Sequence, residues 1–231
     1  MPERETERRS VRLLFDLQAC QTEGSAHRGV GRYSQALFSA MLEVANPRRI
    51  HALASAQRRN QPDLRGVPGN RRHYLTDLPR WGSARDHSGG DQDTLDSLAV
   101  SSLIATIEPD LVHLSHVFEG YSDRVALPSY SNRPLGQVLS ATLYDLIPYR
   151  YPEIYLANED FARWYAQRTR WLRNADLLLS ISESSRSDAI AMLDLDPSRI
   201  VTASRTISSV IPIRRELARH FWLGMASVVS T

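Results

Sequence analysis

Two closely spaced glycines, Gly29 and Gly31, and the adjacent Arg32 begin a helical pattern that follows a short apolar segment and a long polar loop. Glycine lets backbone N–H groups approach an anion closely, and the positive end of a helix dipole favours negative charge at that point. These residues are therefore candidates for binding a phosphate group. The alternative is a flexible loop whose glycines only ease the turn into the helix, and the sequence leaves both interpretations open.

Known nucleotide-binding motifs do not fit this glycine pair. A dinucleotide fingerprint needs its first glycine directly after the strand and an acidic residue at the end of the second strand. Here a long insertion precedes Gly29, Ser34 stands at the third glycine position, and Arg58 and Arg59 follow the second apolar run. The chain contains no Gly-Lys pair, so a Walker A loop is excluded. An NADP-dependent oxidoreductase using Arg58 and Arg59 is consequently the least favoured hypothesis.

Further polar residues come at or after the ends of three other apolar segments, and we take them as candidates for a cleft or acceptor site: His116, Glu119, Tyr144, Asp145, Ser182 and Glu183. A glutamate in such a loop is a general base or a ligand for sugar hydroxyls, and tyrosines stack on sugar rings. Each also has a simpler interpretation, as a turn residue for Glu119, a rigid crossover with buried rings for Tyr144, and a helix cap for Ser182. His113 is expected to be a core histidine, and its spacing from His116 does not support a metal pair.

The elements that must position these residues alternate along the chain. Apolar runs predict strands at 11–17, 50–54, 110–115, 138–146, 175–181 and 199–203, with a short one at 73–76. Helical spacing predicts helices at 29–44, 93–107, 160–173 and 184–193. The fold class is therefore α/β and Rossmann-like, a mainly parallel sheet with helices on both faces. Ligands bind at the carboxyl ends of such strands, so loops 18–28, 115–121, 144–152 and 182–185 should cluster at one edge.

Composition restricts the class of protein. The chain has 231 residues, 42% hydrophobic and 23% charged, which suits one globular domain, here residues 11–203. A disordered tail at 1–10 and an atypical C-terminal segment at 204–231 flank it. The single cysteine, Cys20, excludes an internal disulfide and indicates a cytoplasmic protein. A net charge of +2 predicts no nucleic-acid partner.

The predicted helix 160–173 mixes aromatic residues with arginines and has two interpretations. Such a face can lie on an anionic membrane surface, which would make the protein peripheral to the inner membrane. Alternatively, Phe161, Trp164, Tyr165 and Leu172 follow the i, i+3, i+4 spacing of a core-facing stripe. The spacing favours the core.

Four motifs together resemble the N-terminal domain of family 4 glycosyltransferases of bacterial surface-polysaccharide pathways. They are Asp16-Leu-Gln-Ala-Cys-Gln-Thr with His27-Arg-Gly-Val-Gly-Arg-Tyr33, His113-Leu-Ser-x-x-Phe-Glu-Gly120, Leu143-Tyr-Asp-Leu-Ile-Pro148, and Ala175-Asp-Leu-Leu-Leu-Ser-Ile-Ser-Glu-Ser-Ser-Arg186. Each motif alone is weak, but their order and spacing agree across residues 11–203.

The resemblance implies one half of a GT-B enzyme, in which the N-terminal domain binds a glycan or lipid-linked acceptor and a second domain binds the nucleotide-sugar. It implies retaining transfer, no cofactor and no metal, with Gly29, Gly31 and Arg32 at the donor phosphates. Many relatives have His where this chain has Tyr144. The family's second domain carries a Glu-x₇-Glu motif, whereas residues 204–231 hold the single acid Glu216. The chain is thus expected to lack the donor-binding domain and to be inactive alone. The alternative function is a non-catalytic acceptor- or partner-binding module.

Overall fold

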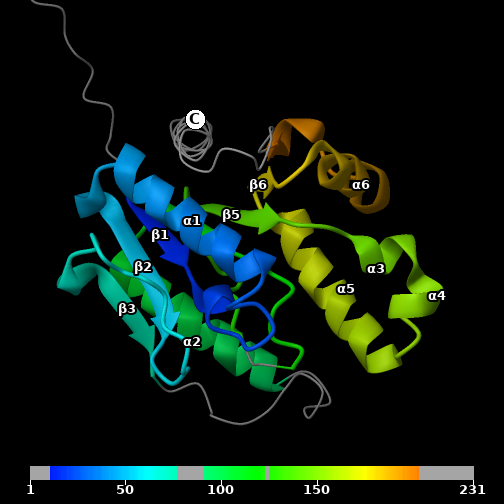
Figure 1. Cartoon of the computed structure of the whole chain (residues 1–231), viewed down its shortest axis with the longest axis horizontal. Helices are drawn as coiled ribbons and strands as arrows, with labels where there is room; N and C mark the ends of the chain where they lie inside the picture. The colour runs from blue at the N-terminus through cyan, green and yellow to red at the C-terminus, as the bar shows by residue number, and fades with distance from the viewer. Residues whose placement is uncertain (1–10, 77–90, 123–124, 203–231) are drawn as a thin grey trace, which may run out of the picture.

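The computed structural model describes residues 11–76, 91–122 and 125–202, and in these residues all the strands belong to one parallel sheet (Figure 1). The strand order is β3-β2-β1-β4-β5-β6-β7. The strands are β1 Leu13–Asp16, β2 Ile50–Ser55, β3 Arg72–Leu75, β4 Leu111–Leu114, β5 Val138–Leu143, β6 Leu177–Ser180 and β7 Ile200–Thr202. This Rossmann-like α/β arrangement confirms the predicted fold class.

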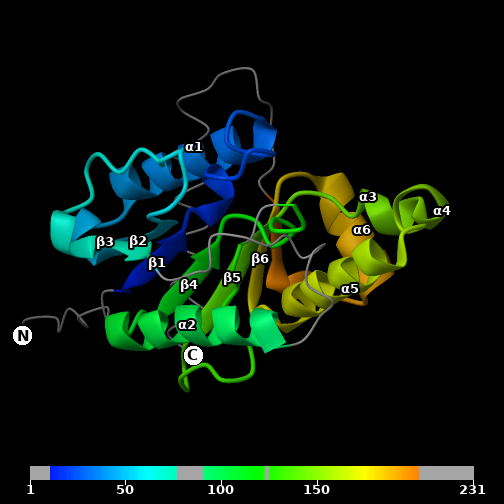
Figure 2. The ribbon, with the colours of Figure 1, turned by 90° about the horizontal axis from the view of Figure 1, so that it is seen from below.

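Helices cover both faces of the sheet. Helix α1, Gly29–Val44, lies on one face, and α2, Asp91–Ile107, lies on the other (Figure 2). Helices α5, Glu159–Asn174, and α6, Glu183–Leu193, contribute buried residues to the same core cluster as α2. The chain moves in one direction from β1 to β3 and in the other from β4 to β7, and right-handed crossovers then place the connecting helices on opposite faces.

The central strands are apolar because both of their faces are buried. In β1 the side chains alternate, so that Leu13 and Phe15 pack with α1 while Leu14 packs in the cluster that contains α2. Phe15 and Leu14 are fully buried, and burial of each contributes about 1.5–3 kcal/mol of hydrophobic free energy. These contacts hold the strand ends, and therefore the loops that follow them, in fixed positions.

The predicted strands and helices are present with small shifts at their ends, and α1 has the predicted bounds. The prediction fails between residues 144 and 155. There β5 ends at Leu143, and the expected loop contains two short helices, α3 Ile147–Arg150 and α4 Pro152–Tyr155. Pro148 and Pro152 lie in their first turns, where proline is tolerated because that N–H has no helical partner. The predicted tails at 1–10 and 204–231 lie outside the described residues.

Helix α5 turns its aromatic side chains inward. Trp164, Tyr165 and Leu172 are buried, and Phe161 is half-buried. The rings of Phe118 and Tyr165 stack with centroids 4.4 Å apart. The core interpretation of this helix is thereby confirmed. In the described part of the chain, no helix combines the length and the apolar character that crossing a membrane requires.

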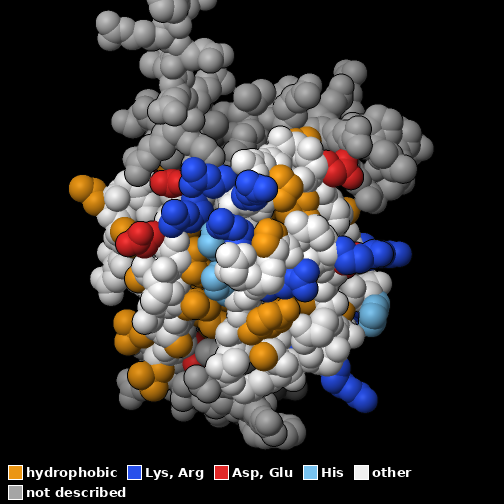
Figure 3. Space-filling model, turned by 90° about the vertical axis from the view of Figure 1, so that its left-hand side faces the viewer, with side chains coloured by type: hydrophobic (Ala, Val, Ile, Leu, Met, Phe, Trp, Pro, Cys, Tyr) orange, Lys and Arg blue, Asp and Glu red, His pale blue; other side chains and the backbone are white. Residues whose placement is uncertain are grey.

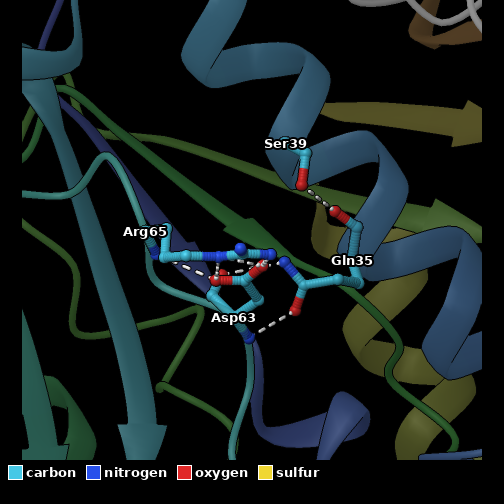
Figure 4. Close-up of polar contacts among 4 residues, drawn as sticks. All are labelled: Gln35, Ser39, Asp63 and Arg65. Carbon is cyan, nitrogen blue, oxygen red and sulfur yellow. Dashed lines mark hydrogen bonds and ion pairs between the residues drawn. The ribbon is translucent and has the colours of Figure 1, made fainter.

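The segment between β2 and β3 is tied to α1 by one side-chain amide (Figure 4). The Gln35 side chain donates from Nε2 to the Asp63 carbonyl and accepts from the Asp63 N–H, both at 2.9 Å. Asp63 also pairs with Arg65 at 2.6 Å, an exposed contact that adds little to stability. The two amide bonds therefore hold this segment beside the helix.

The edge of the sheet formed by β3 is basic. Arginine side chains gather there around two histidines (Figure 3). Arg71 donates to His51 Nε2 at 2.7 Å, and His51 Nδ1 lies 2.8 Å from His73 Nε2. Burial, His73 and the neighbouring arginines lower the pKa of His51 to about 4. Charged residues on an edge strand oppose pairing with another sheet.

Candidate functional site

The loops that follow β1, β4, β5 and β6 meet at the carboxyl edge of the sheet, as predicted. The loop after β1 contacts the loop after β4 through Thr22 and Glu119. The residue that follows β5, Tyr144, contacts Ser34 of α1 and Ser185 of α6. The rings of His116 and Tyr144 lie with centroids 4.7 Å apart. One contiguous site therefore contains residues from all four loops.

Ser25 organises the loop that leads into α1. Its carbonyl accepts the N–H of Arg28 at 3.0 Å and the N–H of Gly31 at 3.1 Å. A Cβ on Gly31 would lie 2.4 Å from the Ser25 carbonyl oxygen and 2.8 Å from that of Ala26. Gly31 is therefore required for the close approach of loop and helix, and its N–H is already used within the protein.

Gly29 and Arg32 differ from Gly31 in being accessible. Gly29 is exposed, and a Cβ built on it would meet no atom within 4 Å. The side chain of Arg32 is exposed and has no partner among the described residues. At the first turn of α1, a helix of 16 residues, these are the two predicted phosphate-loop residues that an anion could reach.

Glu119 lies against the loop after β1. Thr22 Oγ1 donates to Glu119 Oε2 at 2.9 Å, and Ser25 Oγ donates to Glu119 Oε1. Both carboxylate oxygens thus accept hydrogen bonds from within the protein. Glu119 was predicted to be either a turn residue or a ligand for sugar hydroxyls, and either role must be compatible with these two hydrogen bonds.

Tyr144 lies beneath the site surface. Its residue is 8% exposed, and its hydroxyl lies 2.9 Å from Ser34 Oγ and donates to the carbonyl of Val30 at 3.2 Å. Burial raises the pKa of the phenol well above its usual value. Tyr144 therefore fastens the start of α1 to the end of β5 with a neutral hydroxyl.

His116 is the predicted site residue with an unsatisfied polar atom. Its Nδ1 is buried without a hydrogen-bond partner among the described residues. Burial, and then the positive charge of Arg168, lower the pKa of His116 to about 3, so its ring is neutral at physiological pH. A neutral imidazole can donate to or accept from a hydroxyl group. Within the described part of the chain, the buried hydroxyls of Tyr33 and Tyr165 also have no hydrogen-bond partner, so these two groups can still form hydrogen bonds.

The remaining predicted residues have local roles. Asp145 is exposed and accepts the N–H of Ile147, the first residue of α3, at 3.2 Å. Ser182 caps α6 by accepting the Ser185 N–H at 3.1 Å, as predicted. Glu183 is exposed, pairs with Arg186 at 3.1 Å and accepts from Thr202 Oγ1 at 3.0 Å. These contacts place all three at the carboxyl edge.

Sequence reasoning missed Asp16 and Gln18 as site-building residues. Asp16 is 3% exposed and accepts from the Gln18 N–H at 2.8 Å and from Gln18 Nε2 at 2.9 Å. Burial outweighs these bonds and raises the pKa of Asp16 to about 7. Gln18 Nε2 also donates to the carbonyl of Ala126 at 2.9 Å. The signal that could have identified them was a polar residue, Asp16, at the end of an apolar strand, with a second one, Gln18, just after it.

His113 is enclosed in the sheet, as predicted. Its Nδ1 lies 2.8 Å from Ser140 Oγ and its Nε2 3.2 Å from Thr142 Oγ1, both on β5. Burial lowers the pKa of His113 to about 3. Among the described residues, no three His, Cys, Asp or Glu side chains come together as metal ligands would.

Comparison with known proteins finds similarity to mannosyltransferases. No protein-family model matches the chain. The chain is similar to proteins described as serotype-specific mannosyltransferase WbdA of Escherichia coli, one of them 27% identical over 206 residues, 85% of this chain and 24% of that protein. A second match is 32% identical over 106 residues, 45% of this chain and 13% of the relative. The third is 29% identical over 119 residues, 51% and 14% of the two chains. The chain thus spans a quarter or less of the length of these relatives.

Proposed function

We propose that this chain is the acceptor-side domain of a glycosyltransferase that builds a surface polysaccharide. The observation that carries the proposal is the similarity to a mannosyltransferase across 206 residues, because it extends over 85% of this chain. The meeting of these loops at the carboxyl edge supports it, since ligands of parallel α/β sheets bind there. The donor is a nucleotide-activated mannose, and the acceptor is a glycan or a lipid-linked glycan.

The proposed roles follow from which groups are exposed and which keep a polar atom without a hydrogen-bond partner among the described residues. Gly29 and Arg32 face the donor diphosphate, where a helix N-terminus and a free guanidinium favour negative charge. The neutral ring of His116 and the aromatic residues around it contact the acceptor sugar. Transfer retains the anomeric configuration. The activity also needs a donor-binding domain, because stabilisation of the leaving diphosphate is usually the largest catalytic contribution.

The experiment separates acceptor binding from turnover. Saturation-transfer NMR measures binding of a mannose-terminated oligosaccharide to the 231-residue chain, with a glucose-terminated one as the control. Release of GDP from GDP-mannose is then measured for the chain alone and for the chain expressed together with a donor-binding domain. We expect selective binding by the chain and turnover in the combination.

Each outcome bears on the proposal. Rapid turnover by the chain alone would show that no further domain is needed. Selective binding without turnover in either sample would favour a non-catalytic acceptor-binding module. Absence of oligosaccharide binding at millimolar concentration would contradict the acceptor-side assignment.

Contact with a membrane surface is a further part of the proposal, since a lipid-linked acceptor lies there. The aromatic face of α5 does not serve it, because Trp164 and Tyr165 are buried. We expect the chain to float with liposomes that contain anionic lipid at low salt and to be released by high salt. Equal recovery with and without anionic lipid would contradict this contact.

A further inference from the structure

Glu119 joins two loops that are far apart in the sequence. Its carboxylate accepts from Thr22 Oγ1 at 2.9 Å and from Ser25 Oγ, whereas Glu119 itself follows β4. Thr22 is buried and Ser25 is 6% exposed, so both hydroxyls are held within the protein. Hydrogen bonds to an ionised acceptor are stronger than neutral ones. This carboxylate therefore fixes the loop after β1 against the loop after β4.

The contact continues from Ser25 to the first turn of α1. The Thr22 carbonyl accepts from Ser25 N–H at 3.2 Å and from Ala26 N–H at 2.9 Å, and the Ser25 carbonyl accepts from Arg28 N–H and Gly31 N–H. The absence of a Cβ on Gly31 lets this turn lie directly on the helix. Movement of Ser25 would consequently move both amides and the accessible Gly29 between them.

From this geometry we infer that Glu119 is a positioning residue for the turn at residues 28–31, which contains Gly29, and is not a ligand of the acceptor sugar. The anion that the turn receives is the donor diphosphate, and this part of the inference rests on the proposed function. Glu119 acts through Thr22 and Ser25: it holds the loop in the conformation that leaves Gly29 open. Two carboxylate oxygens are suited to this task because one side chain can accept from two hydroxyls at once.

The experiment compares both ends of the contact in the whole 231-residue chain. The variants are Glu119→Ala, the pair Thr22→Val with Ser25→Ala, all three together, and Glu119→Gln. The amide can keep both contacts if Ser25 donates to its oxygen and its NH₂ group donates to Thr22. Glu153→Ala is the control, because Glu153 is an exposed carboxylate on α4.

Two measurements are made on every variant. Hydrogen exchange at the amides of Arg28 and Gly31 reports the loop directly. NMR titration of the Gly29 amide with inorganic pyrophosphate reports anion binding, and saturation transfer with the mannose-terminated oligosaccharide reports acceptor binding. We expect about tenfold faster exchange in Glu119→Ala, equal to a local ~1.4 kcal/mol. The Thr22/Ser25 pair should show a similar change, the triple variant no more than Glu119→Ala, and Glu119→Gln most of the wild-type protection.

Pyrophosphate binding should weaken in parallel, with oligosaccharide binding unchanged. Unchanged exchange at Arg28 and Gly31 in the Thr22/Ser25 variant would overturn the inference. So would a loss of oligosaccharide binding in Glu119→Ala that the Thr22/Ser25 variant does not share, because Glu119 would then contact the acceptor itself. If pyrophosphate does not shift the Gly29 amide signal in any sample, the donor-phosphate role proposed for this loop fails. Hydrogen exchange still decides whether Glu119 positions the turn.

Discussion

Replacement of Gly31 by alanine tests the packing on which the candidate site depends. The new Cβ would lie 2.4 Å from the Ser25 carbonyl oxygen and 2.9 Å from Ala26 Cα. Both are backbone atoms, so the loop has to move, and crowding of this kind typically costs about 1–3 kcal/mol. The movement also weakens the bonds from Arg28 and Gly31 to Ser25, each contributing about 1 kcal/mol. Because alanine favours the helical conformation more than glycine does, the substitution also stabilises α1 by at most about 1 kcal/mol.

The expected net effect is a loss of about 2 kcal/mol in the free energy of unfolding, which for a chain of this size lowers Tm by about 4–8 °C. Gly29→Ala is the matched control, because nothing lies within 4 Å of its Cβ position. That variant should be unchanged or about 0.4–1 kcal/mol more stable. Urea unfolding followed by circular dichroism measures both. If Gly31→Ala is as stable as Gly29→Ala, the described contact between loop and helix is wrong.

Three further predictions concern charge and pH. The pKa of His113 is about 3 in the folded chain and about 6.5 in the unfolded chain, so the folded protein loses up to ~1.4 kcal/mol of stability for each pH unit that the pH falls between these values. His113→Gln should therefore flatten the fall in the urea midpoint between pH 6.5 and 4.5. An unchanged slope would contradict burial of the ring. The pKa of Asp16 is about 7 in the folded chain and 3.8 in the unfolded chain, so the contribution of Asp16 to stability is full below pH 3.8 and is lost as the pH rises towards 7. Because Asp16 therefore opposes the loss of stability on acidification, Asp16→Asn should make that loss steeper. A shallower slope would refute the raised pKa. Arg32 is exposed and its side chain has no partner among the described residues. Arg32→Ala should therefore change the free energy of unfolding by less than about 0.5 kcal/mol and weaken the binding of pyrophosphate. Equal binding of pyrophosphate in an NMR titration would exclude Arg32 from the anion site.

The order of the elements and the sheet edge that carries the candidate site could both be predicted from the amino-acid sequence. Continuous apolar runs such as Leu13–Phe15 mark buried parallel strands, and helical spacing marks α1, because burial imposes these patterns locally. A helix cap at Ser182 or Ser184 can be predicted for the same reason, since a cap involves residues only three positions apart, and the structure gives Ser182 this role. Parallel topology then placed the loops at one edge without knowledge of any contact. The two short helices at 147–155 were missed because proline marks a turn and a first helical turn equally well.

The accessibility of the candidate residues, in contrast, depends on contacts that form when the chain folds. Gly29 and Gly31 are equivalent in sequence, yet one is open and the other is pressed against Ser25. Glu119 and Tyr144 were candidates for ligand contact, but their polar atoms are occupied by Thr22 and Ser25 and by Ser34 and Val30. His116 instead keeps a buried nitrogen without a partner among the described residues. The contacts of Glu119 and Tyr144 join residues 94 to 114 positions apart in the chain, and local spacing carries no information about such contacts until the sheet brings the loops together.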